Sequence, residues 1–275
     1  MSLQKEKSVL IEYKHDGALV MLTINRPQSL NALNRDVLIS LEQALLEIRA
    51  KSEPRVIIIT GAGEKAFVAG ADIAAMHDLG SNAIADYIEL GQRVMRHIEQ
   101  FHLPVLAAVN GFALGGGLEL ALACDCIFAA DTAKVGQPEV NLGIIPGFGG
   151  TQRLIHRCGI GATKMLCLSG DIIAADEALR LHLVDKVVPA ADLLAVTEAF
   201  AQKIIEKAPC AVAGAKKVIL DAVNTSLTAG LRAEVDEFLR LFATKDREEG
   251  MKAFLQKRKP QWENAWPGNL DFTFR

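Results

Sequence analysis

The chain has 275 residues and a mass of 29.7 kDa, which allows one large domain or one domain with an appendage. Half of its residues are hydrophobic and 23% are charged, so the chain can bury a sizeable core, and disorder is excluded as its main state. It has 30 Lys and Arg against 33 Asp and Glu, the opposite of the balance expected for a protein built around electrostatic binding of nucleic acid.

The first two thirds of the chain alternate strands with helices. Branched apolar residues predict a strand over 18–24, and apolar residues at helical spacing predict a helix over 38–48. Uninterrupted apolar runs predict buried strands over 56–60 and 104–109, with an amphipathic helix over 84–98 between them. This alternation predicts an α/β fold.

The last third of the chain has a helical pattern. Helices are expected over 193–207 and 211–220, and a long apolar stripe follows over 227–242. No further strand signal appears in this part of the sequence. We therefore expect a core domain over 1–200 and a helical domain over 201–275.

The cysteines, the histidines and the amino terminus indicate in which cellular compartment the protein is expected and whether it is expected to bind a metal. Five cysteines without a Cys-x-x-Cys pair indicate small apolar side chains in a reducing compartment. The six histidines are dispersed and form no His-Glu-x-x-His motif, so no metal site is expected. The amino terminus lacks the apolar core of a signal peptide, and no apolar run reaches the ~18–20 residues of a membrane span. We expect a cytoplasmic protein that binds neither membranes nor nucleic acid.

The first of three glycine clusters mimics a dinucleotide-binding fingerprint. Gly61-Ala62-Gly63-Glu64-Lys65-Ala66 follows a predicted strand, as that fingerprint requires. A helix should then open directly on the glycines, but Gly70 would break it in its second turn. We interpret this cluster as a turn, which disfavours a nucleotide-dependent oxidoreductase.

The other two clusters adjoin predicted helices. Gly115-Gly116-Gly117 joins a buried strand to a helical segment, and 146–150 contains three glycines immediately before another. Consecutive glycines cost conformational entropy, and they persist most readily where the backbone must approach something closely or point its N–H groups at it. A tight turn explains one or two of the three glycines in the second cluster.

Two glutamates lie near these glycines in apolar surroundings. Glu119 is inside an apolar run, and Glu139 is flanked by Pro138 and Val140. An unpaired carboxylate is costly to bury, and burial moves carboxyl pKa values toward the working pH of a general acid or base. The pair therefore suits acid/base catalysis. Surface charge is the alternative for each glutamate, and the sequence leaves open whether the two meet.

Several segments together resemble the enoyl-CoA hydratase (crotonase) family. The similarity runs from about Asn25 to Lys259, nearly the whole chain. The segments that carry it are Asn25-Arg26-Pro27 with Asn31-Ala32-Leu33, the run Lys65 to Ile73, the run Asn110 to Leu154, and Glu249 to Phe254 with Lys257-Arg258-Lys259. Their order and spacing make the resemblance specific at the level of the family.

The resemblance implies an acyl-CoA thioester substrate and a set of site residues. Two backbone N–H groups, at the positions of Ala69 and Gly116, would form an oxyanion hole for the thioester carbonyl. Glu119 would orient and deprotonate a water molecule, and Glu139 would deliver a proton to C2. The other substrate-binding positions that the resemblance implies are Gly70, Ala71, Asp72, Gly147 and Lys257.

The resemblance also implies a fold, an assembly and an activity. The expected fold is a crotonase-like spiral of β-β-α units followed by a helical C-terminal oligomerisation region, assembled as a homotrimer or homohexamer. Retention of both carboxylates favours an enoyl-CoA hydratase of fatty-acid β-oxidation, with coenzyme A as part of the substrate and no separate cofactor. The dehydratase direction, an enoyl-CoA isomerase and a non-catalytic scaffold are the alternatives.

Two stretches depart from the family pattern. Ala74-Ala75 stand where many relatives carry charged residues, and the resemblance stops at about Lys259. The tail, Pro260 to Arg275, contains both tryptophans of the chain, Trp262 and Trp266, together with Phe272 and Phe274. Disordered termini are poor in aromatic residues, so we expect an extended tail whose rings pack on the protein surface.

Overall fold

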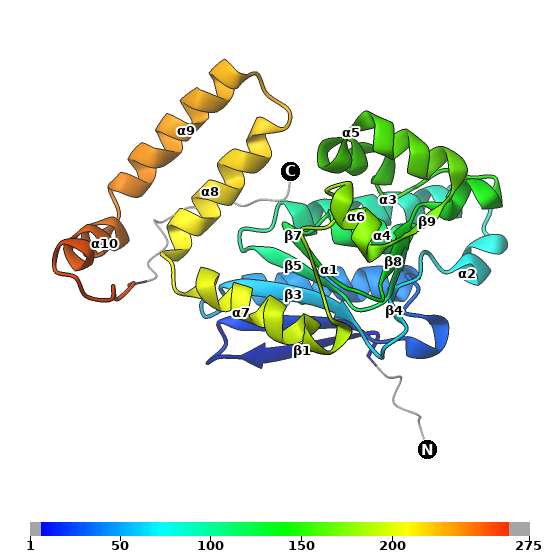
Figure 1. Cartoon of the computed structure of the whole chain (residues 1–275), viewed down its shortest axis with the longest axis horizontal. Coiled ribbons are helices and arrows are strands. Elements are labelled where there is room, and N and C mark those ends of the chain that lie inside the picture. Colours follow the sequence, from blue (N-terminus) through cyan, green and yellow to red (C-terminus); the bar gives the residue numbers. More distant parts are fainter. Residues whose placement is uncertain (1–6, 264–275) are drawn as a thin grey trace.

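Two β-sheets form the body of the protein in a computed structural model that describes residues 7–263 (Figure 1). The larger sheet has six strands in the order β1-β2-β3-β5-β7-β10, and the smaller has four in the order β4-β6-β8-β9. Pairing is parallel except between β1 and β2 and between β8 and β9. The strands are β1 Val9–Lys14, β2 Leu19–Ile24, β3 Val56–Gly61, β4 Ala66–Val68, β5 Val105–Val109, β6 Phe112–Leu114, β7 Cys126–Ala130, β8 Lys134–Gly136, β9 Ile172–Ala174 and β10 Lys186–Val188.

The chain repeatedly gives one strand to each sheet before it enters a helix. β3, β5 and β7 are neighbours in the larger sheet, and each is followed directly by β4, β6 or β8 in the smaller one. This repeat is the spiral of β-β-α units that the family resemblance implied. The helices of this part are α1 Arg35–Arg49, α2 Ile73–His77, α3 Ser81–Glu99, α4 Gly116–Leu122, α5 Gly150–Ser169 and α6 Ala175–Arg180, with short 3-10 helices η1 Pro27–Ser29, η2 Pro138–Leu142 and η3 Ala190–Asp192.

The core lies around the larger sheet. Every residue of β3 and β5 is buried, which confirms the two strands that uninterrupted apolar runs predicted. The predicted helices over 38–48 and 84–98 are also confirmed, as the central parts of α1 and α3, and these two helices pack against each other. The α7 helix (Leu193–Ile205) contacts β2, β3, β5 and β7.

Sequence patterns missed β1 and the short strands. Each strand of the smaller sheet has three residues, too few to show an alternation of apolar and polar side chains. Residues 62–65 connect β3 to β4, another strand, which confirms that the first glycine cluster forms a turn rather than the start of a nucleotide-binding helix.

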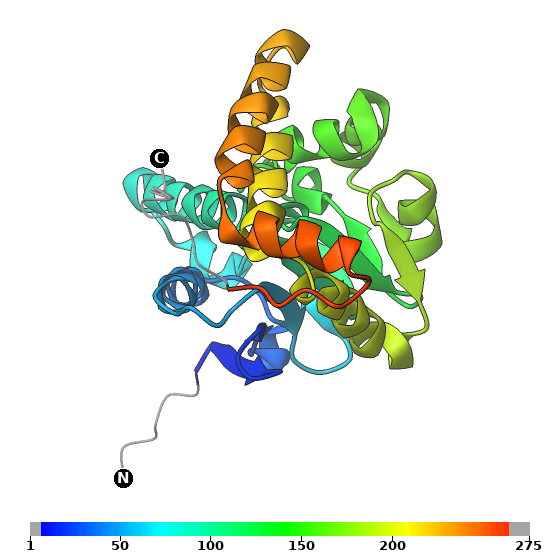
Figure 2. The same cartoon turned by 90° about the vertical axis from the view of Figure 1, so that its left-hand side faces the viewer.

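The last helices extend away from the sheets. In Figures 1 and 2, α8 (Pro209–Ala222) and α9 (Leu227–Phe242) form a pair that projects from the body, and α10 (Lys245–Leu255) follows. The predicted helices over 193–207, 211–220 and 227–242 are confirmed. The proposed boundary near residue 200 falls within α7 and stays a prediction. No helix within residues 7–263 combines the length and apolarity needed to cross a membrane.

Candidate active site

The glycines at the start of α4 are required by close contacts. Gly115 has φ +49°, and a Cβ there would lie 2.7 Å from Glu139 Oε1. A Cβ on Gly117 would lie 1.9 Å from the Val68 carbonyl oxygen, so the helix fits against β4 only without a side chain. The cluster therefore brings the first turn of α4, which carries Glu119, close to both β4 and Glu139.

Glu119 is almost fully buried, with 1% of its surface exposed. Its Oε1 accepts hydrogen bonds from the backbone N–H groups of Phe148 (2.8 Å) and Gly150 (2.6 Å). Burial raises the pKa of Glu119 to about 7, although these two N–H groups lower it, and the nearby Glu139 raises it further. The carboxyl group can therefore exchange a proton near neutral pH.

Glu139 lies in η2, directly after the proline that begins this 3-10 helix. Burial raises the pKa of its carboxyl group above the usual value. The side chain of Gln137 is fully buried beside it. With the amide orientation assigned from its hydrogen-bond partners, Gln137 Nε2 donates to Glu139 Oε1 (2.9 Å) and Oε2 (3.0 Å). Sequence reasoning missed Gln137, since an uncharged amide two residues before an acid gives little signal.

Both glutamates line one cleft of ≈ 120 Å³. The sequence left open whether they meet, and the fold brings them together from α4 and η2. Much of the remaining lining is apolar, which suits an acyl chain. The larger apolar side chains of the lining are Ile73, Met76, Ile88, Leu114, Leu142, Ile144, Ile145 and Phe148.

The oxyanion hole predicted at Ala69 requires a correction. The Ala69 N–H donates to the Leu30 carbonyl oxygen (3.0 Å), so this donor is already used. Among the described residues, the Ala71 N–H has no hydrogen-bond acceptor, and a Cβ on Gly116 would lie 3.4 Å from Ala71 N. Gly116 is the first residue of α4, where N–H groups lack helical partners. Ala71 and Gly116 therefore offer two available donors beside the carboxylates.

Known proteins share both the sequence pattern and the fold of this chain. The sequence model for enoyl-CoA hydratase/isomerase matches residues 14–265. The chain is 48% identical over 241 residues to crotonyl-CoA hydratase of Syntrophomonas wolfei, which covers 88% of this chain and 93% of the relative. It is 46% identical over 244 residues to short-chain-enoyl-CoA hydratase of Clostridium acetobutylicum, covering 89% and 94% of the two chains. The chain belongs to the enoyl-CoA hydratase/isomerase family.

A solved structure of this family confirms the fold. The crystal structure of enoyl-CoA hydratase from Bacillus anthracis matches with a TM-score of 0.91 and 39% sequence identity, over 94% of this chain and all of the other. The predicted crotonase-like spiral with a helical C-terminal region is therefore correct.

The remaining positions implied by the resemblance to the enoyl-CoA hydratase family divide into two groups. Gly70, Ala71 and Gly147 line the cleft, but Asp72 does not. The Asp72 carboxylate accepts a hydrogen bond from Arg26 Nη2 (3.0 Å). It also accepts one from the backbone N–H of Ala75 (3.3 Å), because Asp72 is the N-cap of α2. This placement gives the side chain a structural role and does not support its predicted contact with substrate.

Lys257 lies just beyond the end of α10, whereas α2 contributes Ile73 and Met76 to the cleft. Figure 1 shows α10 and α2 at opposite sides of the molecule. The predicted contact of Lys257 with coenzyme A therefore requires the cleft of a second subunit, and it stays a prediction.

Proposed function

We propose that this chain is an enoyl-CoA hydratase that adds water across the double bond of a short trans-2-enoyl-CoA to give the 3-hydroxyacyl-CoA, as in fatty-acid β-oxidation. The observation that carries the proposal is the convergence of two carboxyl groups with raised pKa values in one apolar cleft, beside two backbone donors. The names of the two relatives, crotonyl-CoA hydratase and short-chain-enoyl-CoA hydratase, support both the reaction and the short acyl chain.

The proposed reaction uses the two carboxyl groups as a base and an acid. Ionised Glu119 takes a proton from water as the water oxygen bonds to C3, and protonated Glu139 gives its proton to C2. The π electrons of the double bond move toward the thioester, so negative charge develops on the carbonyl oxygen before C2 is protonated. The N–H groups of Ala71 and Gly116 stabilise that charge, and one such donor is worth about 3–4 kcal/mol.

The two glutamates need different protonation states in the proposed reaction, Glu119 ionised and Glu139 protonated, although the Gln137 amide favours the ionised form of Glu139 as well. Two carboxylates that share a site disfavour double ionisation, so one proton is retained near neutral pH. The two backbone N–H groups on Glu119 favour its ionised form. No chemistry beyond that of these side chains and the thioester is required, so we propose a reaction without a separate cofactor or metal. The cytoplasmic location stays a prediction.

Conservative replacement of each glutamate tests the proposed function. We expect Glu119→Gln and Glu139→Gln each to lower kcat for crotonyl-CoA hydration by about 10²–10⁴-fold, the usual worth of a positioned acid or base. The assay follows loss of the enoyl absorbance in protein without added NAD(P), and Glu64→Gln, at an exposed site, is the control. Turnover near that of the wild-type protein in either variant removes that glutamate from the mechanism.

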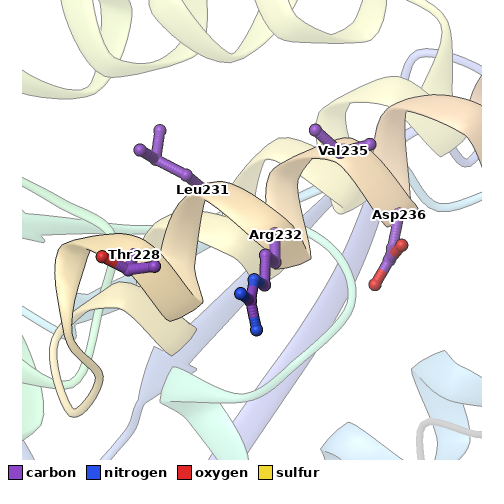
Figure 3. A pocket seen from close by; sticks show the side chains of 5 residues that line it. All are labelled: Thr228, Leu231, Arg232, Val235 and Asp236. Atoms are coloured by element: carbon purple, nitrogen blue, oxygen red, sulfur yellow. The ribbon is translucent and has the colours of Figure 1, made fainter.

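We also propose that the chain assembles as a homotrimer or homohexamer through its helical region. The apolar stripe predicted over 227–242 is solvent-exposed on α9, with Leu227 80% and Phe238 62% exposed. A hollow of ≈ 490 Å³ adjoins this helix, and Figure 3 shows Leu231 and Val235 on one side of α9 and Arg232 and Asp236 on the other. Such an apolar face is uncommon on a monomer and supports burial against another subunit.

A further inference from the structure

The loop that holds Glu119 is itself held from outside the cleft. Residues 148–150 supply both N–H groups that bind Glu119 Oε1. Gly149 has φ +105°, in the left-handed region, a conformation that residues other than glycine rarely adopt. The orientation of Glu119 depends on whatever keeps this loop in place.

Arg153, in the first turn of α5, contacts this loop through its side chain. Its Nη1 donates to the Phe148 carbonyl oxygen (3.0 Å), and a Cβ on Gly149 would lie only 2.4 Å from this nitrogen. The rest of the guanidinium forms a two-bond pair with Glu99 at the end of α3, from Nε to Oε1 (2.9 Å) and from Nη2 to Oε2 (3.0 Å). This paired geometry fixes the plane of the guanidinium.

We propose that Arg153, oriented by Glu99, is a positioning residue that holds the Phe148–Gly150 backbone in the conformation in which its two N–H groups converge on Glu119. This inference rests on the proposed function, in which Glu119 is the base. Arg153 does not line the cleft. It acts on the reaction through the loop and through its charge.

The charge of Arg153 favours the ionised form of Glu119. Its guanidinium lowers the pKa of Glu119, opposing the effect of burial. Within residues 7–263, Glu139 in η2, Tyr87 in α3 and Cys167 in α5 are titratable groups that also interact electrostatically with Glu119. Among these groups, Arg153 is the one whose positive charge stabilises the carboxylate near neutral pH.

A purely structural role is the alternative explanation of the ion pair. The Arg153–Glu99 pair joins α5 to α3, and its loss would then lower stability without a specific effect on Glu119. Arg157, on the next turn of α5, is a matched control because it binds Asp185 and the Leu183 carbonyl oxygen (3.3 Å) but not the loop. Replacing it removes a similar set of bonds from the same helix.

The experiment compares Arg153→Gln, Arg153→Lys and Arg157→Gln in crotonyl-CoA hydration, after wild-type turnover has been established. We expect Arg153→Gln to lower kcat by about 10²-fold, the scale of effect for misplacing a catalytic group, with KM nearly unchanged. The acidic limb of the pH–rate profile should move to a higher pH than in the wild-type protein, because loss of the positive charge raises the pKa of Glu119. Arg153→Lys, which keeps the charge but not the two-bond geometry, should retain more activity and the wild-type limb. Arg157→Gln should keep wild-type kcat.

A double variant separates positioning from stability. If Arg153 acts through Glu119, adding Arg153→Gln to Glu119→Gln should lower the residual rate by less than about 3-fold, because interacting sites are not additive. The positioning role is wrong if Arg153→Gln lowers kcat by the same factor in the wild-type and Glu119→Gln proteins and leaves the acidic limb of the pH–rate profile unchanged. It is also wrong if the Arg153→Gln variant keeps wild-type kcat. Wild-type protein without hydratase activity would instead refute the proposed function.

Discussion

At the scale of single residues, two opposing effects act on the ionised form of Glu119: hydrogen bonds stabilise it and burial destabilises it. Two backbone N–H groups hold one of its oxygens, yet burial still raises its pKa to about 7. An ordinary buried glutamate would be destabilising without a charged partner. Burial of Glu119 therefore lowers the stability of the protein, but it also provides the carboxyl group titrating near neutral pH that the proposed reaction needs.

This raised pKa makes protein stability depend on pH in a predictable direction. Between the unfolded value of 4.5 and about 7, the folded protein binds more protons at Glu119 than the unfolded protein does. The contribution of this group is therefore fully present below pH 4.5 and is lost as the pH rises through 7. The loss is about 3 kcal/mol at most, at ~1.4 kcal/mol for each pKa unit.

Urea unfolding of the wild-type protein and Glu119→Gln at pH 5 and pH 8 measures this effect. We expect the variant to gain stability relative to the wild-type protein on going from pH 5 to pH 8. The exposed Glu64→Gln should show no such gain. A constant difference between Glu119→Gln and the wild-type protein at both pH values would contradict the raised pKa.

At the scale of elements, a partly buried ion pair joins α8 to the segments that lead into β5 and β7. Lys216 of α8 donates from Nζ to Asp125 Oδ2 (2.7 Å) and to the Leu103 carbonyl oxygen (3.0 Å). Asp125 Oδ2 also accepts the N–H of Val105, the first residue of β5. Burial raises the pKa of Asp125, whereas Lys216 acts to lower it. This pair therefore links α8 to the segments that precede β5 and β7.

Removal of the lysine should be costly, because it leaves a mostly buried carboxylate without its cation. We expect Lys216→Met to lower the free energy of unfolding by about 3 kcal/mol, the low end for a broken buried pair, since Asp125 is 30% exposed. The neighbouring Lys217 pairs with Asp221 at an exposed site, so Lys217→Met should change stability by less than ~0.5 kcal/mol. Equal losses in the two variants, measured by urea unfolding, would show that the buried pair does not anchor α8.

The start of the aromatic tail also packs on helices, as far as the structure describes it. Trp262 Nε1 donates to the Glu206 carbonyl oxygen (2.9 Å), and a Cβ on Gly250 of α10 would lie 3.2 Å from the ring. The tail therefore begins against its own helical region. Trp266, Phe272 and Phe274 lie outside the described residues, so their packing stays a prediction.

Two truncations test how much this contact stabilises the protein. A chain ending at Lys259 loses the Trp262 contact, and we expect its melting temperature to fall by about 3–6 °C, which corresponds to ~1–2 kcal/mol. A chain ending at Glu263 keeps the contact and should melt higher than the shorter chain. Identical melting temperatures of the wild-type protein and the chain ending at Lys259 would show that the tail contributes nothing.

At the scale of the whole molecule, the proposed assembly would account for two features that one chain leaves unexplained. The apolar stripe on α9 is exposed, and Lys257 follows a helix on the opposite side of the molecule from α2. An oligomer would bury the stripe and could bring a basic side chain to a neighbouring cleft. Both consequences follow from the same projection of α8 and α9 from the body.

Charge placed on the stripe should prevent assembly. We expect the wild-type protein to have the mass of a trimer or hexamer by light scattering at micromolar concentration, and Phe238→Glu to have a lower mass because a buried, unpaired carboxylate is costly. Glu234→Gln, at an exposed polar position of the same helix, should keep the wild-type mass. A monomeric wild-type protein would contradict the proposed assembly.

The sequence alone determined the features that depend on local pattern and residue chemistry. Apolar runs and helical spacing predicted the central strands and most long helices, because burial on one or both faces leaves a periodic record. Glu119 and Glu139 could be selected because carboxylates are rare in apolar surroundings. The glycines before α4 indicated close backbone approach, and the resemblance supplied the family.

Only the tertiary structure decided which groups meet. The family resemblance placed an oxyanion-hole donor at Ala69, and only the bond from the Ala69 N–H to the Leu30 carbonyl oxygen shows that this donor is used and that Ala71 is the available one. The pairing of Arg153 with Glu99 likewise depends on a contact between distant parts of the chain. Hydrogen-bond partners of this kind leave no periodic pattern, because each is set by how separate elements pack rather than by neighbours in sequence.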